Sequence, residues 1–326
     1  MRIARWRDGA DVAEGFVEAD QVIPFAGGES VASVLAGGLD AAHELHARTL
    51  REVSRRRPLS QVRLLAPVAP PSVRDFVTFE EHVEGVSAGV EGKSNVPAEW
   101  YDAPTFYFTN PHTILGPDEP VRPPATERLD FELELAAVIG GVPGSDGTNL
   151  GPETAAGHIF GYTIMNDWSA RDLQAREMKV RLGPCKGKDF GTSLGPWIVT
   201  ADELVPFLDD DGFLAVRAEV RVNGELIGDD LMSNMGWPFP ELVAYASRNS
   251  RVVPGDVLGS GTAGNGGCLG ELWGRNGELS PPPLAEGDVV AMRIEGIGEL
   301  TAAVGAAVDG GPIAVARPRP RRRQRA

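Results

Sequence analysis

The chain has 326 residues, enough for one large domain with a smaller appendage. Its formal net charge is −15 although the last ten residues hold six arginines, so the rest of the chain is strongly acidic and should repel nucleic acid. Two cysteines without CxxC spacing exclude a disulfide framework and fit a reducing cytoplasm, and no apolar run is long enough to cross a membrane.

Residues 1–70 are predicted to form a small N-terminal α+β module. Residues 1–25 have the pattern of short strands, with a turn at RDGAD, and residues 30–57 have the pattern of a helix. The segment PLSQVRLLAPVAPPS that follows is extended, because proline and the residue before it are biased away from helix. It leads into a main domain over residues 71–312, and the Arg- and Pro-rich residues 313–326 are predicted to be disordered.

The main domain is rich in short strands. Helical candidates are few and lie around 151–158, 169–180 and 238–250, while residues 84–105 have the composition of a flexible lid. Strands at this spacing with few crossover helices favour a sandwich, roll or barrel of mixed strands over a doubly wound parallel sheet. The strand-like runs are LELAAVIGG, IFGYTIMND, PWIVT, LAVRAEVRVNGELIG, DVLGSGT, DVVAMRIEGIGEL and LTAAVGAAV.

The segment LDFELELAAVIG alternates acidic and apolar residues. A strand here would place Asp130, Glu132 and Glu134 on one face. A solvated acidic face is the ordinary explanation of such a pattern. If the face instead lines a cavity, the like charges repel one another in a low dielectric, and a hard cation such as Mg²⁺, Mn²⁺ or Ca²⁺ relieves that repulsion.

A further carboxylate ends the run GYTIMND. Asp167 closes this strand-like run, and Ser169-x-x-Asp172 has the form of a capping box that opens a helix. Asp167 is therefore predicted at a strand-to-helix corner. There it is either a turn residue or a ligand of the same cation as Glu132 and Glu134.

Taken in order, ELEL, NDWSARDLQ, KGKDFGTSLGPW, GSGTAGNGG and EGIG resemble the fumarylacetoacetate hydrolase superfamily over about residues 70–305. The resemblance implies a mixed β-sandwich roll, usually a homodimer, with Mg²⁺ or Mn²⁺ (Ca²⁺ being possible) held by Glu132, Glu134 and Asp167. In RDFVTFEEHV, Asp75 matches a fourth ligand. Val77 replaces a tyrosine common in this motif, which makes fumarylacetoacetate itself a doubtful substrate.

The same motif places a histidine where the family has its catalytic base. His82 suits that role because the ordinary pKa of histidine lies near neutrality. By resemblance to fumarylacetoacetase its carboxylate partner is Glu271, whereas smaller family members place a glutamate in a lid near the histidine, which would favour Glu81 or Glu84. Lys188 resembles the lysine that faces the developing oxyanion.

Three residues resemble the family's substrate contacts. Arg171 and Gln174 stand three residues apart on the helix predicted after Asp167, hence on one face, and Thr262 lies in GSGTAG. Residues 259–264 also fit the dinucleotide pattern GxGxxG, but the flanking sequence lacks a βαβ unit, so we reject that interpretation.

These residues predict an enzyme acting on a small dicarbonyl or 2-oxo acid, with neither nucleic acid nor membrane as a partner. The leading hypothesis is hydrolysis of the carbon–carbon bond in an acylpyruvate-type 1,3-dicarbonyl acid. A decarboxylase, isomerase or tautomerase could use the same site, because a metal-stabilised enolate can be reprotonated or formed by loss of carbon dioxide. A non-catalytic binding protein of the same fold is the third alternative, weakly permitted by Val77.

Overall fold

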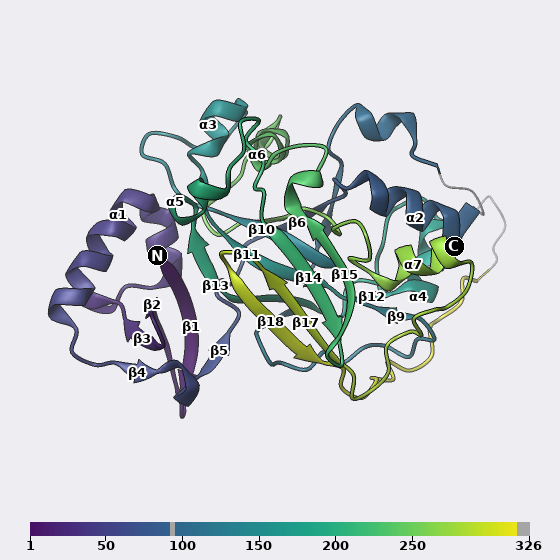
Figure 1. Cartoon of the computed structure of the whole chain (residues 1–326), viewed down its shortest axis with the longest axis horizontal. Coiled ribbons are helices and arrows are strands. Elements are labelled where there is room, and N and C mark those ends of the chain that lie inside the picture. The colour runs from purple at the N-terminus through teal and green to yellow at the C-terminus, as the bar shows by residue number, and fades with distance from the viewer. Residues whose placement is uncertain (92–94, 318–326) are drawn as a thin grey trace, which may run out of the picture.

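The structure, a computed structural model, describes residues 1–91 and 95–317 (Figure 1). The strands are β1 (Arg2–Asp8), β2 (Asp11–Glu18), β3 (Gln21–Pro24), β4 (Arg57–Pro58), β5 (Arg63–Leu65), β6 (Val73–Phe76), β7 (Phe106–Thr109), β8 (Ile114–Leu115), β9 (Leu129–Asp130), β10 (Leu133–Ile139), β11 (Ile159–Asp167), β12 (Ser169–Ala170), β13 (Thr192–Thr200), β14 (Arg217–Val222), β15 (Glu225–Leu231), β16 (Val257–Gly259), β17 (Val289–Ile294) and β18 (Gly298–Ala303). The helices are α1 (Val31–Glu52), α2 (Glu80–Glu91), α3 (Pro152–Ala156), α4 (Arg171–Met178), α5 (Ala201–Leu204), α6 (Phe239–Ser247) and α7 (Leu269–Asn276).

A large mixed sheet and a smaller antiparallel sheet form the body of the protein. The large sheet has the order β4-β3-β2-β1-β13-β11-β10-β16-β6-β7, with β5 added to β1 and β8 added to β13. Only the pairs β8–β13 and β6–β16 are parallel among the described strands. The sheet β15-β14-β17-β18 packs across the middle of the large one (Figure 1). This arrangement confirms the predicted mixed β-sandwich roll.

The N-terminal residues fold as the sequence pattern predicts. Strands β1 to β3 occupy residues 1–25, and α1 begins after Ser30, whose hydroxyl accepts a hydrogen bond from the Ser33 amide. The helix ends at Glu52, five residues earlier than expected. Because β1 pairs with β13 of the main body, one sheet runs through both parts. The division at residue 70 stays a prediction.

The three predicted helices of the main domain are present as α3, α4 and α6, but three further helices were missed. These are the short helix α5 and the helices α2 and α7, of which α2 and α7 pack against each other. The expected lid over residues 84–105 therefore begins as the C-terminal part of a helix, and its residues 92–94 lie outside the described chain. Farther along it, the Trp100 indole donates to the Val77 carbonyl at 2.7 Å.

Two local predictions around the acidic segment were wrong. The chain is not one strand through LDFELEL, because β9 pairs with β12 and the chain then breaks before β10. Asp130 lies outside the group of four close carboxylates, although it shares Arg171 with Glu132. The capping box is also absent, since Ser169 donates to the Asp167 carbonyl and α4 starts only at Arg171. Ser169, which the capping box would need, is instead paired with Asp130 in the β9–β12 ladder.

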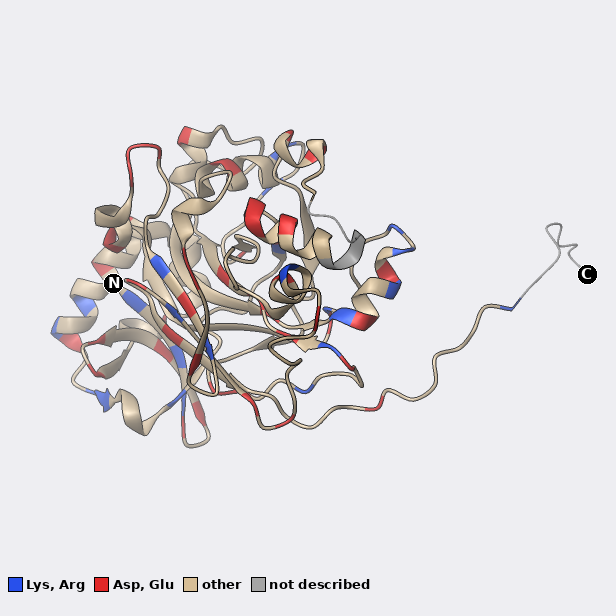
Figure 2. Ribbon diagram, turned by 45° about the vertical axis from the view of Figure 1, so that its right-hand side comes forward, with Lys and Arg blue, Asp and Glu red and all other residues tan. Residues whose placement is uncertain are grey.

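Residues 313–317 are exposed and extend from the body without helix or strand (Figure 2). The rest of the predicted tail lies outside the described residues. Acidic and basic positions are interspersed along the ribbon. Within residues 1–91 and 95–317, no helix combines the length and apolarity needed to span a membrane.

Candidate metal centre and its cavity

Four predicted carboxylates converge on three strands of the large sheet, β6, β10 and β11, with β16 lying between β6 and β10. Asp75 comes from β6, Glu134 from β10 and Asp167 from the end of β11, while Glu132 precedes β10. One carboxylate oxygen from each residue lies within 4.8 Å of the others, and all four residues are buried. The sequence pattern therefore identified a group of residues that is also close in space.

Close approach of two of these carboxylates depends on a glycine between them. Gly259 on β16 lies between β6 and β10. A Cβ atom at this position would lie 2.5 Å from Glu134 Oε2 and 3.1 Å from Asp75 Oδ1. Any larger residue would therefore push the Asp75 and Glu134 carboxylates away from their present positions.

The burial of these acids is incompletely compensated by the protein. Burial and the neighbouring acids raise the pKa values of Asp75 and Glu134 well above the ordinary range, and burial raises the pKa of Asp167 as well. The buried oxygens Asp75 Oδ1, Glu134 Oε1 and Asp167 Oδ1 have no hydrogen-bond partner. An all-oxygen set with unpartnered atoms fits a hard divalent cation rather than zinc.

A buried lysine and a partly buried arginine neutralise part of the cluster. The Lys188 ammonium lies 2.5 Å from both Glu132 Oε2 and Asp167 Oδ2, and Arg171 Nη2 lies 2.8 Å from Glu132 Oε1. Burial opposes ionisation of Glu132, but Lys188 and Arg171 outweigh it and lower the pKa of this carboxyl below its ordinary value. Burial lowers the pKa of Lys188, but Asp167 and Glu132 outweigh that effect and raise it, so the ammonium stays charged.

Asp130 contacts Arg171 from a second side and is not part of the carboxylate cluster. Asp130 accepts from Arg171 Nε and from the Leu269 and Gly270 amides at the start of α7, each at 2.8 Å. Arg171 Nη1 donates to Gln174 Oε1 at 3.1 Å, so the two predicted substrate residues do lie on one face of α4. Asp130 thus connects α7 to the arginine of the site.

The predicted histidine approaches the cluster from a different layer. His82 lies on α2 and is 7% exposed, and its Nδ1 atom is 3.9 Å from Glu271 Oε2 on α7 and 3.7 Å from Cys268 Sγ. Among the described residues, Glu271 is the carboxylate that comes within 4.0 Å of this imidazole, whereas Glu84 is exposed. The geometry favours Glu271 over the lid glutamates.

Burial acts in opposite directions on this histidine and its partner. It lowers the pKa of His82 to about 4, so the imidazole is neutral at pH 7. It raises the pKa of Glu271 to about 7, although Arg275, 2.8 Å from Glu271 Oε1, opposes that rise. Helices α2 and α7 touch here because Gly85 has no side chain: a Cβ would lie 2.3 Å from Glu271 Cγ.

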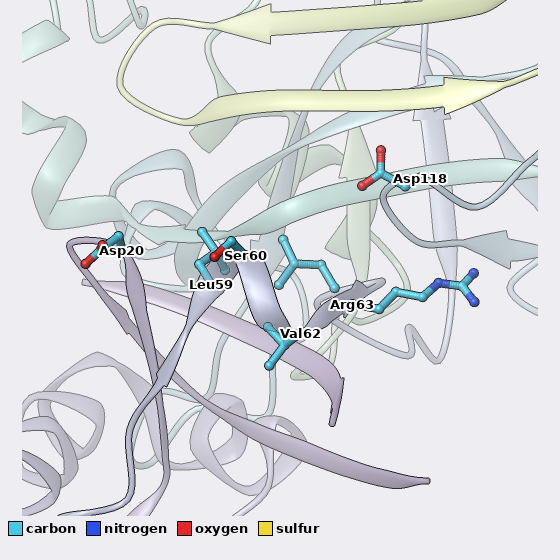
Figure 3. A pocket seen from close by; sticks show the side chains of 7 residues that line it. Asp20, Leu59, Ser60, Val62, Arg63 and Asp118 are labelled. Atoms are coloured by element: carbon cyan, nitrogen blue, oxygen red, sulfur yellow. The ribbon is translucent and has the colours of Figure 1, made fainter. Parts of the chain in front are cut away.

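A cavity of about 330 Å³ joins the two parts of the site. Its lining includes seven of the ten predicted residues: Asp75, His82, Glu132, Arg171, Gln174, Lys188 and Thr262. A second hollow of about 670 Å³ lies beside the N-terminal strands, around Leu59 and Arg63 (Figure 3). It contains none of the predicted residues.

Sequence analysis missed a polar residue of the cavity that contacts the carboxylate cluster. Tyr107 on β7 is the direct pairing partner of Asp75 on β6, and its hydroxyl donates to Asp167 Oδ2. The neighbouring strand thereby supplies a hydroxyl near the position where Val77 lacks one. The alternation in FYFT indicates a strand, but nothing local identifies β6 as its partner.

Comparison with known proteins places this site in a family. Residues 72–305 match the family described as fumarylacetoacetate (FAA) hydrolase, C-terminal, and residues 1–67 match one described as Rv2993c-like, N-terminal. Fumarylacetoacetase of Arabidopsis thaliana is 32% identical over 271 residues, covering 68% of this chain and 63% of that protein. The alignment thus spans less than two thirds of that enzyme. Oxaloacetate tautomerase YisK of Bacillus subtilis is 30% identical over 271 residues, with 80% and 82% covered.

Solved structures agree with this assignment. A fumarylacetoacetate hydrolase from Exiguobacterium antarcticum is 29% identical with a TM-score of 0.70, covering 94% of this chain and 99% of that one. A maleylpyruvate hydrolase from Sphingobium sp. SYK-6, solved with manganese(II) and pyruvate, is 22% identical with a TM-score of 0.69, covering 94% and 100%, and shows likeness of fold. By the match over residues 72–305, this chain is a member of the fumarylacetoacetate hydrolase superfamily.

Proposed function

We propose that the protein is a divalent-metal-dependent hydrolase that cleaves a carbon–carbon bond in an acylpyruvate-type 1,3-dicarbonyl acid. The observation that carries this proposal is the cavity in which an oxygen-rich carboxylate cluster meets a neutral, buried imidazole. Hydrolysis of such a bond needs both a base for water and stabilisation of an oxygen anion.

Mg²⁺ or Mn²⁺, with Ca²⁺ as a further possibility, would be held by Asp75, Glu132, Glu134 and Asp167. The three unpartnered carboxylate oxygens support this assignment, as does the manganese in the Sphingobium hydrolase of the same fold. When bound, the cation would polarise the attacked carbonyl and stabilise the negative charge that develops on the leaving carbon's enolate.

His82 would act as the general base. Its neutral imidazole takes a proton from water, and the resulting hydroxide oxygen bonds to the acyl carbonyl carbon. The bond from that carbon to the adjacent CH₂ then breaks, its electron pair stays on the CH₂ carbon, and that carbon receives the proton. The products are a carboxylic acid and pyruvate, and Glu271 orients the imidazole throughout.

The remaining predicted residues would bind the substrate. Lys188 brings an ammonium to the cluster itself and would face the oxygen charge formed on the attacked carbonyl. Arg171 and Gln174 lie on one helix face of the cavity and Thr262 lines it, so these three would contact the substrate's carboxylate end.

A tautomerase acting on a 2-oxo acid is the second candidate. The Bacillus subtilis oxaloacetate tautomerase aligns over 82% of its own length, compared with 63% for the Arabidopsis fumarylacetoacetase. Tautomerisation needs the base and the cation but no attacking water, so the same residues serve it. Decarboxylation and isomerisation remain related alternatives, and a non-catalytic binding protein is less well supported.

Turnover of acylpyruvates by the purified protein, with and without Mn²⁺ or Mg²⁺, tests the proposal. We expect metal-dependent release of pyruvate that is lost in Glu132→Ala and retained in Glu127→Ala, which removes an exposed glutamate outside the cavity. Keto–enol exchange of oxaloacetate without pyruvate release would instead indicate a tautomerase, and carbon dioxide a decarboxylase. Metal binding without any turnover would support the binding protein.

We also propose that the protein is a homodimer of the cytoplasm, as the resemblance and the cysteine usage predicted. Sedimentation of the purified protein at several concentrations tests the first part. A concentration-independent monomer mass would contradict it.

A further inference from the structure

Besides its charged residues, the cavity is lined by a set of apolar side chains. They come from β6 and the residue after it, from α2 and β7, and from α4 with the loop after it. The apolar members are Phe76, Val77, Val86, Phe106, Met178 and Pro184. Methionine among aliphatic neighbours forms a wall that adapts to apolar groups of different shape.

The positive charges of the cavity are already paired. Arg171 lies 2.8 Å from both Asp130 and Glu132, and Lys188 lies 2.5 Å from both Glu132 and Asp167. Within the described part of the chain, the lining contains no other lysine or arginine. A second carboxylate placed against the apolar residues would therefore lose part of its hydration without gaining an unpaired cation as a partner, which is unfavourable.

We propose that the substrate's distal substituent is uncharged and apolar, such as an alkyl or aryl acyl group, and that Val77, Val86 and Met178 determine this specificity. The inference rests on the proposed function in one respect, because it assigns the 2-oxo acid end of the substrate to the carboxylate cluster and its cation. Val77 fits the assignment, since the residue contributes no hydroxyl or charge to this wall.

Binding of a matched pair of acids tests the inference apart from turnover. 2-Oxohexanoate and 2-oxoadipate have the same carbon chain and differ at the far end, where one has a methyl group and the other a carboxylate. Neither is a 1,3-dicarbonyl, so neither is cleaved. By calorimetry with Mn²⁺ present, we expect 2-oxohexanoate to bind at least about tenfold more tightly. Equal binding, tighter binding of 2-oxoadipate, or no binding of either acid would overturn the inference.

A charge placed in the wall should change this preference. Met178 is 48% exposed, so Met178→Arg should fold, and we expect it to improve 2-oxoadipate binding about two- to fivefold. Met178→Gln adds polarity without charge and should leave 2-oxoadipate binding unimproved. Val180→Arg adds the same charge two residues away, at a position that is 75% exposed and does not line the cavity. An equal effect of Met178→Arg and Val180→Arg would contradict the role given to Met178.

Turnover then separates this inference from the proposed function. Preferred binding of 2-oxohexanoate without cleavage of any acylpyruvate would overturn the proposed reaction and leave the specificity in place. Faster cleavage of carboxylate-ended than of alkyl-ended acylpyruvates would overturn the specificity and leave the proposed reaction in place.

Discussion

The two sides of the cavity are built in different ways. The strand face, which we define as Asp75, Glu134 and Asp167, is set by backbone pairing of β6, β10, β11 and β16. The helix face, defined as His82 and Glu271, depends on the contact of α2 with α7 at Gly85. Burial favours the neutral forms on both faces, but the strand face brings three acids together and leaves some of their oxygens without a hydrogen-bond partner, whereas the helix face pairs one histidine with one acid.

Because the two faces are built differently, we expect substitutions on one face to change a different measurable property from substitutions on the other. A cation is needed to relieve the strand face, so changes there should alter metal affinity first. Changes on the helix face should alter proton transfer or the dependence of stability on pH while metal binding persists.

The largest expected effect comes from the strand face. Glu134→Gln removes a charge from the carboxylate cluster without changing its size. Metal affinity should fall by more than about 100-fold, since even outer-shell partners of a metal are worth about 10- to 100-fold. Turnover at low metal should fall by about 10⁴-fold, which corresponds to several kcal/mol of charge stabilisation. Calorimetry with Mn²⁺ and a pyruvate assay measure the two quantities, and unchanged affinity would remove Glu134 from the ligand set.

A smaller effect on turnover, without an effect on the metal, is expected on the helix face. His82→Asn removes the base, and kcat should fall by about 10²- to 10³-fold. Mn²⁺ affinity should stay within about threefold of the wild-type value, because His82 does not belong to the carboxylate cluster. Loss of metal binding in this variant would show that the two faces are not independent.

The smallest of the three effects concerns stability and pH. Burial raises the pKa of Glu271 from the ordinary 4.5 to about 7. Between these values the folded protein holds a proton that the unfolded chain has lost, so this contribution to stability is complete below pH 4.5 and is lost as pH rises through 7. Glu271→Gln cannot ionise, and at pH 8 its free energy of unfolding should exceed that of the wild type by up to about 3 kcal/mol.

Urea denaturation of the chelator-treated protein at pH 5 and pH 8 checks this expectation. The titration of His82, which removes stability as pH falls from 6.5 toward 4, is present in both proteins and cancels from the comparison at each pH. Glu278→Gln, at an exposed position just after α7, is the control and should behave as the wild type does. An equal difference at both pH values would show that Glu271 is not the titrating group.

Sequence reasoning was more successful for the strand face than for the helix face. Alternation placed Glu132 and Glu134 on one side of the chain, and the end of an apolar run marked Asp167, because strand geometry is local. The break between β9 and β10 leaves no trace in the alternation, so the single strand predicted through Asp130 was wrong.

For the helix face, resemblance alone connected His82 to Glu271. Neither α2 nor α7 was predicted, and Gly85 weakens the helical pattern of α2 at the point where α2 meets α7. The partnership of Tyr107 with Asp75 could not be predicted either, because strand pairing depends on contacts distant in the sequence.

Asp130 has a consequence for how such a cavity can diversify. It accepts hydrogen bonds from the first amides of α7 and from Arg171, so one carboxylate fixes the position of a helix relative to the cation-binding strands. Substitutions in α2, in α7 and in the loop after α4 could change which substrate is bound, while the Asp130 hydrogen bonds keep α7 and Arg171 in place. A combinatorial library that varies the walls and leaves Asp130 fixed would therefore sample new substrates without having to rebuild the chemistry each time.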